Sequence, residues 1–122
     1  MLFEKGIALK AYPLKLLYLP LSEQAAMQAV KPSEAAGLLH PPRAQVLFTV
    51  PKRNFKKAVD RNLLKRRLRE AYRLNKHLLS DSNVYFLAGF IYLGREPVPY
   101  QQIEDKLIFC LKRLKEVQQP LF

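Results

Sequence analysis

Basic side chains at helical spacing dominate the middle of this 122-residue chain. Residues 52–79 hold eleven Lys and Arg against two acids, Asp60 and Glu70. On a helix, seven of the polar side chains fall within one arc of roughly 140°, and leucines fill most of the other side. One side of such a helix can be buried while the other binds a polyanion. The residues of the arc are Arg61, Asn62, Lys65, Arg66, Arg69, Arg73 and Lys76.

The net charge of +11 is concentrated in this part of the chain. Residues 43–79 carry twelve basic and two acidic groups, whereas the segments before and after them are nearly neutral. Charge that serves only solubility would be scattered. The concentration therefore indicates a surface for a polyanion, with nucleic acid first and an anionic membrane second. Arg67 alone falls among the leucines, and we expect its stem to lie on apolar surface with its head in water.

Composition also indicates where the chain works. The single Cys110 excludes an internal disulfide and fits a reducing cytosol. No apolar run approaches the roughly 20 residues of a spanning helix, and the N-terminus lacks the shape of a signal peptide. We therefore expect a cytoplasmic protein without a membrane partner.

The sequence offers no pattern for catalysis by the protein itself. Its two His and one Cys lack metal-ligand spacing. A nuclease made of protein alone would need clustered carboxylates to hold metal ions, and the ten acids do not cluster. Asp60 and Glu70 are expected to form ion pairs with neighbouring Arg residues, and Cys110 is expected in the core. No catalytic residue and no metal site are predicted.

The elements that position the basic stretch are those of an α+β fold. Residues 7–19 are apolar and extended, with Pro13 marking either an edge position or a break between two short strands. A long connection follows, with a helical turn around residues 22–30. The remaining elements are a buried strand at 44–50, a helix at 55–79 with Asn54 as its N-cap, a central strand at 84–93, and an amphipathic helix from Pro99 to about Gln118.

The run from Arg61 to Glu70 resembles the signature of the bacterial ribonuclease P protein subunit, Arg-Asn-Arg-x-Lys-Arg-x-x-Arg. The chain matches it at Arg61, Asn62, Lys65, Arg66 and Arg69, and has Leu63 where the family usually has a third Arg. Residues 50–58 also resemble the family's strand end and basic loop.

The resemblance implies one domain over residues 1–122. The family has a small mixed sheet with helices packed on one face, in the order (α)βββαβα. It also has a left-handed βαβ crossover through the basic helix, a ribosomal protein S5 domain 2-like fold. Here the family's N-terminal helix is largely missing. The face that it leaves is expected to form a homodimer or to accept residues 117–122, which are apolar enough to dock.

The function that the resemblance implies is to bind ribonuclease P RNA and precursor tRNA, and to promote removal of the 5′ leader. The RNA subunit carries the catalytic site, and magnesium is expected for the RNA–protein holoenzyme. The leader lies on the concave sheet face, with Phe3, Tyr18 and Phe48 as candidates and core packing as the alternative for each. The predicted RNA-binding residues are Lys52, Arg53, Lys56, Lys57, Arg61, Asn62, Lys65, Arg66, Arg69 and Arg73.

Two other interpretations stay open on the residues alone. One is a general RNA- or ribosome-binding protein without a role in cleavage. The other is a DNA-binding regulator that lays the basic helix in a major groove. Arg residues suit all three, because the planar guanidinium can donate two hydrogen bonds to one phosphate. A cleavage assay with added bacterial ribonuclease P RNA separates the first interpretation from both others.

Overall fold

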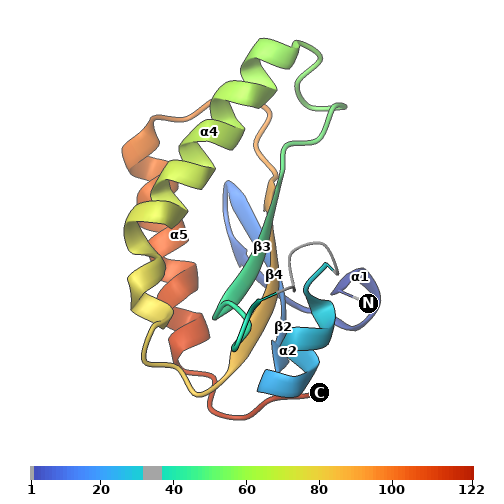
Figure 1. Cartoon of the computed structure of the whole chain (residues 1–122). Helices are drawn as coiled ribbons and strands as arrows, with labels where there is room; N and C mark the ends of the chain where they lie inside the picture. The colour runs from blue at the N-terminus through green and yellow to red at the C-terminus, as the bar shows by residue number, and fades with distance from the viewer. Residues whose placement is uncertain (1, 32–36) are drawn as a thin grey trace.

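One mixed sheet of four strands, in the order β1–β2–β4–β3, carries the fold (Figure 1). The computed structural model describes residues 2–31 and 37–122. The predicted α+β class and order of strands and long helices are confirmed, and the helical turn expected around residues 22–30 is α2. The elements are α1 (Leu2–Lys5), β1 (Ile7–Ala11), β2 (Leu14–Leu21), α2 (Glu23–Ala29), β3 (Ala44–Thr49), α4 (Ala58–Asn75), the 3-10 turn η1 (Lys76–Leu79), β4 (Tyr85–Tyr92) and α5 (Tyr100–Lys115).

The strand pairing explains why the basic helix lies where it does. β2 pairs antiparallel with β1 and β4, and Pro13 lies in the turn between β1 and β2. β3 and β4 are parallel, so a crossover must join them, and α4 is that crossover. In Figure 1 the chain passes from β3 through α4 to β4 in the left-handed sense that the resemblance implied, against the usual right-handed preference.

The long helices α4 and α5 pack on one face of the sheet and enclose the main core (Figure 1). Alternate strand residues reach this face, and helix residues three and four apart meet them. The predicted core position of Cys110 is confirmed, and burial raises the pKa of its thiol to about 11. The core side chains include Leu14, Leu16, Phe86, Phe90 and Tyr92 from the sheet, Leu64, Leu68 and Ala71 from α4, and Ile103, Leu107, Leu111 and Leu114 from α5.

A smaller core lies on the opposite face of the sheet. Leu2 of α1 and Ala26 of α2 pack there against leucines of β2. Ser22 caps the N-terminus of α2, where its side-chain oxygen accepts a hydrogen bond from the backbone N–H of Ala25 at 3.2 Å. The two long helices thus share one face, as predicted, and two short helices occupy the other.

The last residues of the chain lie along β2, beyond the end of its pairing with β1. The backbone N–H of Leu121 donates to the Pro20 carbonyl, and that of Ser22 donates to the Phe122 carbonyl, both at 2.9 Å. Lys5 Nζ lies 5.3 Å from the centroid of the Phe122 ring. The C-terminal segment thus docks, as the sequence suggested, but along the edge of β2 rather than over the sheet face, and Leu121 and Phe122 stay exposed. The homodimer suggested as the other arrangement finds no support.

The basic helix begins later than predicted. α4 starts at Ala58, with Lys57 as its N-cap residue and no side-chain cap, rather than at Phe55 behind an Asn54 cap. The cause is Phe55 itself. Its buried ring packs against the ring of Tyr92, with 5.7 Å between the centroids, so the residues before Lys57 form a loop that reaches the core.

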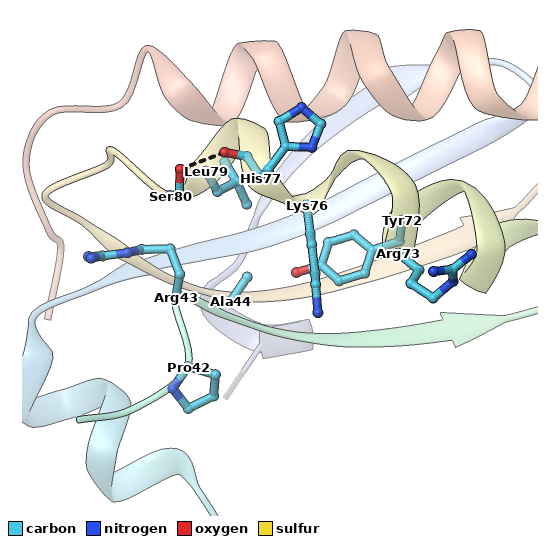
Figure 2. A pocket seen from close by; sticks show the side chains of 9 residues that line it. All are labelled: Pro42, Arg43, Ala44, Tyr72, Arg73, Lys76, His77, Leu79 and Ser80. Carbon is cyan, nitrogen blue, oxygen red and sulfur yellow. Dashed lines mark hydrogen bonds between the residues drawn. The ribbon is translucent and has the colours of Figure 1, made fainter. Parts of the chain in front are cut away.

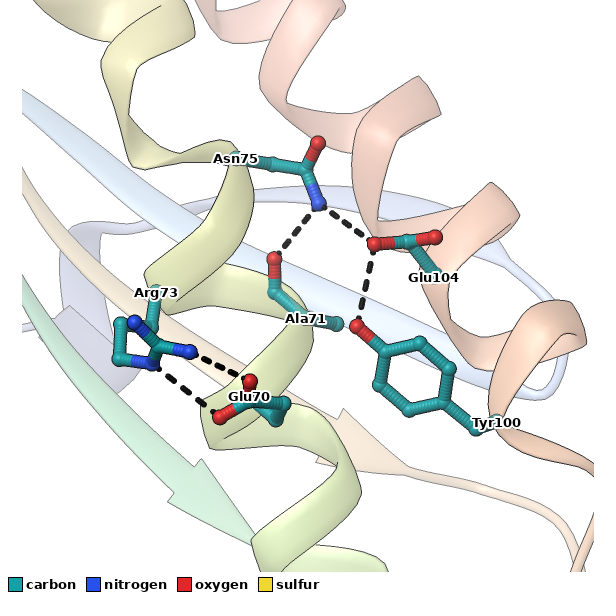
Figure 3. Close-up of polar contacts among 6 residues, drawn as sticks. All are labelled: Glu70, Ala71, Arg73, Asn75, Tyr100 and Glu104. Atoms are coloured by element: carbon teal, nitrogen blue, oxygen red, sulfur yellow. Dashed lines mark hydrogen bonds and ion pairs between the residues drawn. The ribbon is translucent and has the colours of Figure 1, made fainter.

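The same helix also ends earlier than predicted. α4 stops at Asn75, whose side-chain amide donates to the Ala71 carbonyl at 2.8 Å and to Glu104 Oε2 at 3.0 Å (Figure 3). An Asn side chain bonded to the preceding turn competes with the helical backbone. Residues 76–79 therefore continue as the tighter turn η1.

Candidate nucleic-acid interface

The outer side of α4 presents cations to solvent, because its inner side is fixed in the core by leucines. The arc derived from the sequence therefore corresponds to a real surface. Of its members, only Arg73 takes part in an ion pair among the residues that the structure describes. The predicted binding residues on this side are Asn62, Lys65, Arg66, Arg69 and Arg73, all exposed except the half-buried Lys65.

The loop before α4 adds four more cations to the same region. A turn in which the Asn54 N–H donates to the Pro51 carbonyl at 3.2 Å leads into this loop. Its buried Phe55 anchors the loop to the core, so the neighbouring charged side chains point outward. The four predicted residues, all exposed, are Lys52, Arg53, Lys56 and Lys57.

Arg61 connects this loop to the helix. Its Nη1 donates to the Phe55 carbonyl at 2.6 Å and to the Lys56 carbonyl at 3.1 Å. An Arg has five N–H donors, so part of the guanidinium remains for a phosphate. The first residue of the motif therefore positions the loop lysines, a role that the sequence could not show because its acceptors are backbone atoms.

Arg73 is the predicted binding residue with a competing partner. Its Nε and Nη2 donate to the two carboxylate oxygens of Glu70 at 3.1 and 2.6 Å (Figure 3). The hydrogen bond from Arg73 lowers the pKa of Glu70. This is the ion pair predicted for Glu70. The ion pairs of the described residues do not include Asp60, for which the same was predicted.

Arg67 points away from this surface. Its Nη1 donates to the Val98 carbonyl at 2.6 Å and so ties α4 to the loop before α5. The sequence predicted a stem on apolar surface with its head in water. The side chain is half-buried, and its head has a backbone carbonyl partner that the sequence did not predict. Arg67 is a structural residue rather than part of the interface.

Two of the three aromatic candidates for the leader lie on the α4–α5 face. The Tyr18 ring packs edge-on to Phe86, with centroids 6.4 Å apart. The Phe48 ring stacks on Phe90 at 5.9 Å and meets Tyr72 of α4 at 6.0 Å. Since α1 packs on the opposite face, neither ring shares a surface with it. Tyr18 and Phe48 therefore pack against the core, which was the alternative to a role in leader binding.

The third candidate, the Phe3 side chain, lies outside the described residues. On the face that α1 occupies, the sheet aromatic is Tyr85, and the guanidinium carbon of Arg43 lies 4.3 Å from its ring centroid. Strand alternation could have found Tyr85, because it opposes Phe86 and its i+2 neighbours. The sequence does not say which face stays open.

A hollow of about 760 Å³ opens on this second face, beside the edge of β3. Its lining includes Leu47 and Leu87 of the sheet and Lys31 and His40 of the long connection. Gln45 Nε2 donates to the Ala26 carbonyl at 2.9 Å and fixes α2 beside β3. The hollow thus combines apolar sheet surface with basic groups at its margin.

The part of the chain that the structure describes shows neither a metal site nor a membrane-spanning helix. Within residues 2–31 and 37–122, no three His, Cys, Asp or Glu side chains lie close enough together to hold a metal ion. In the same part of the chain no helix has the length and apolar character to cross a membrane. What the arrangement can do chemically is to bind phosphates, through charge and hydrogen bonds.

Solved structures share this fold. The protein titled RNase P protein from Thermotoga maritima superposes with a TM-score of 0.65 at 23% identity, over 92% of this chain and 86% of that one. The RNase P protein of Staphylococcus aureus gives a TM-score of 0.62 at 15% identity, over 97% and 88%. At these identities the likeness shows the fold alone.

Sequence comparisons go further. A family model described as Ribonuclease P matches residues 1–115. The ribonuclease P protein component of Porphyromonas gingivalis is 34% identical over 116 residues, which cover 92% of this chain and 74% of that protein. That of Chlorobium phaeobacteroides is 42% identical over 102 residues, covering 76% and 62%. The chain therefore belongs to the bacterial ribonuclease P protein component family, the protein part of the ribonucleoprotein endonuclease that processes the 5′ ends of tRNA.

Proposed function

We propose that this protein binds the catalytic RNA of ribonuclease P through the outer side of α4 and the loop at residues 52–57. The observation that carries the proposal is the row of exposed cations on an element whose other side is fixed in the core. A row of this kind contacts phosphates and sets the register of an RNA without reading its bases. Within the row, Arg66 and Arg69 take no part in the ion pairs of the described residues.

The 5′ leader of precursor tRNA is assigned to the opposite face of the sheet. Single strands bind in grooves that combine positive charge with aromatic rings. Tyr85 with Arg43, and the hollow bounded by Leu47 and Lys31, supply both on the α1 side. This assignment replaces Tyr18 and Phe48, whose rings face the core beneath α4 and α5.

Catalysis itself is left to the RNA. The described residues offer no three-ligand metal group, so the proposal assigns the magnesium expected for the holoenzyme to the RNA. The protein contributes charge neutralisation and substrate position, which let the RNA bind its own metal ions better. With these RNA partners, we expect the protein to act in the cytoplasm.

A cleavage assay tests the proposal. A bacterial ribonuclease P RNA is incubated with precursor tRNA at low magnesium, with and without the protein. We expect faster removal of the leader with the protein, and no cleavage by the protein alone. Metal-dependent cleavage by the RNA-free protein would contradict the proposal. RNA binding with no effect on cleavage would favour a general RNA- or ribosome-binding protein.

The two faces are distinguished by a second measurement. In the assembled complex, affinities for precursor tRNA with and without a leader give the leader discrimination. We expect Tyr85→Leu to reduce this discrimination, because it removes the ring beside Arg43. Phe48→Leu serves as the matched control and should leave the ratio unchanged. If only the Phe48→Leu variant loses leader discrimination, the leader binds on the α4–α5 side instead.

A further inference from the structure

A pocket of about 450 Å³ lies where α4 passes into η1, against the start of β3 (Figure 2). Its volume is in the range of small-ligand sites. Of the residues assigned above to binding the catalytic RNA, only Arg73 lines it, and Arg43, assigned above to the leader face, lines it as well. Ala44 and Leu79 give it an apolar floor, and no acidic side chain is among its lining residues.

Tyr72 forms an aromatic wall of this pocket. The ring of Phe48 holds it in place, with 6.0 Å between the centroids and 60° between the planes. Its hydroxyl forms no hydrogen bond within the described residues and is not shielded from solvent. Burial of the ring raises the pKa of Tyr72, so the hydroxyl remains a donor at neutral pH.

Lys76 extends the cation row of α4 to the mouth of the pocket. It follows Arg73 by three residues and Tyr72 by four, so it lies on the same side of the helix. It is exposed and takes part in no ion pair of the described residues. Figure 2 shows the Lys76 and Tyr72 side chains both extending from the helix end toward β3.

We propose that this pocket binds one unpaired nucleotide of the RNA that lies along α4, with its base against Tyr72 and Ala44 and its phosphate at Lys76. The inference rests on the proposed function, since it needs an RNA on α4. A regular duplex offers phosphates to exposed cations but no base to a pocket. RNA recognition uses splayed bases from loops and bulges, stacked on aromatic side chains.

Two hairpin RNAs test the inference. They share one stem, and one carries a single bulged uridine in it. Affinities for the full chain are measured by fluorescence anisotropy at one salt concentration. We expect the bulged RNA to bind roughly tenfold more tightly, the effect of stacking one base. Ala44→Leu fills the floor of the pocket and should abolish this preference without weakening the plain stem.

Controls separate the pocket from the rest of the surface. Ala8→Leu makes the same change on the other edge strand, β1, and should keep the preference. Lys76→Gln should weaken the bulged RNA more than the plain stem, and it keeps the test valid if Ala44→Leu does not fold. Arg66→Ala should weaken both RNAs alike.

The outcomes are distinct. Equal affinity of the unmodified protein for the two RNAs overturns the inference, and so does a preference that survives both Ala44→Leu and Lys76→Gln. If salt-dependent, Arg66-sensitive binding persists in that case, the proposed function stands and only the pocket is wrong. If neither RNA binds and ribonuclease P RNA gains no activity, the proposed function itself fails.

Discussion

Helices α4 and α5 lie on the same face of the sheet and bury similar apolar sides, yet their outer sides differ. α5 carries four basic and two acidic residues, and three of the four cations lie in its last turn, where they stabilise the helix dipole. α4 carries six basic and two acidic residues, and its last turn holds only Arg73. The charge on α5 has an explanation in helix stability. On α4, Arg61, Arg67 and Arg73 have partners within the protein, whereas Lys65, Arg66 and Arg69 have none among the described residues. Charge that the fold does not need indicates the binding surface.

The largest expected effect concerns the similar inner sides. Leu68→Ala in α4 and Leu107→Ala in α5 each empty a fully buried position and should each lower the free energy of unfolding by about 2–5 kcal/mol. Urea unfolding gives both values. The protein that remains folded should keep its RNA affinity in both variants. A loss of RNA affinity beyond the unfolded fraction in one variant only would break the comparison.

Cys110 makes the stability contributed by α5 depend on pH, as the partly buried Tyr72 does for α4. Its thiol keeps its proton in the folded protein up to a pKa of about 11, against 9.0 for the ordinary thiol. The contribution of the buried, protonated thiol to the free energy of unfolding is fully present below pH 9. It is lost as the pH rises toward 11, because the thiol ionises first in the unfolded chain. Over this range the loss approaches about 2–3 kcal/mol. The difference between the unmodified protein and Cys110→Ala, measured by urea unfolding at each pH, isolates this effect from the tyrosines. Parallel curves would contradict it.

The outer sides are compared by the salt dependence of RNA binding. If five phosphates of a duplex-like site are neutralised, the logarithm of the binding constant should fall against that of salt with a slope of roughly −4 to −5. Arg66→Ala on α4 should reduce the slope by about one. Lys112→Ala, at an exposed cation of α5, should leave it unchanged. If the two variants have equal slopes, the cations of α4 do not bind RNA and serve only solubility.

The smallest effect separates two glutamates. Glu70→Gln frees Arg73 on the outer side, so RNA affinity should rise slightly while thermal stability stays the same. Glu104 lies between the helices, where its Oε2 accepts hydrogen bonds from Asn75 and Tyr100, both at 3.0 Å (Figure 3). Glu104→Leu should therefore lower the melting temperature and leave RNA affinity unchanged. The opposite pattern would mean that the two surfaces are assigned the wrong way round.

Periodicity predicted the parts of the fold that depend on local pattern. The break at Pro13 follows from the proline, and the buried side of α5 follows from the spacing of apolar residues. The parallel pairing of β3 with β4 came only from the family resemblance, through its βαβ crossover. The start of α4 does not follow from spacing, because it depends on Phe55 reaching Tyr92 of a strand formed later in the chain. No local pattern contains that contact.

In the candidate site, too, the sequence predicted the features that depend on local pattern and missed those that depend on contacts between distant residues. Exposed cations on one side of a helix are visible in sequence, and their positions hold. The role of Arg61 was not visible, since backbone carbonyls leave no trace in composition. The faces of Tyr18 and Phe48 were not assigned either. β2 is apolar except for Lys15 and contributes to both cores, so its alternation does not reveal which face is covered by the long helices.

The pairing of β3 with β4 has a consequence for synthesis on the ribosome. β3 pairs with no strand other than β4 among those described, and the leucines of α4 pack in a core that includes β4 and α5. All of these partners follow α4 in the sequence. A nascent chain that ends before residue 85 therefore carries the basic segment without the scaffold that orders it. The cations of α4 can therefore be ordered into a row only after the last third of the protein has left the exit tunnel. The growing chain thus passes ribosomal RNA before the surface proposed to bind RNA has formed.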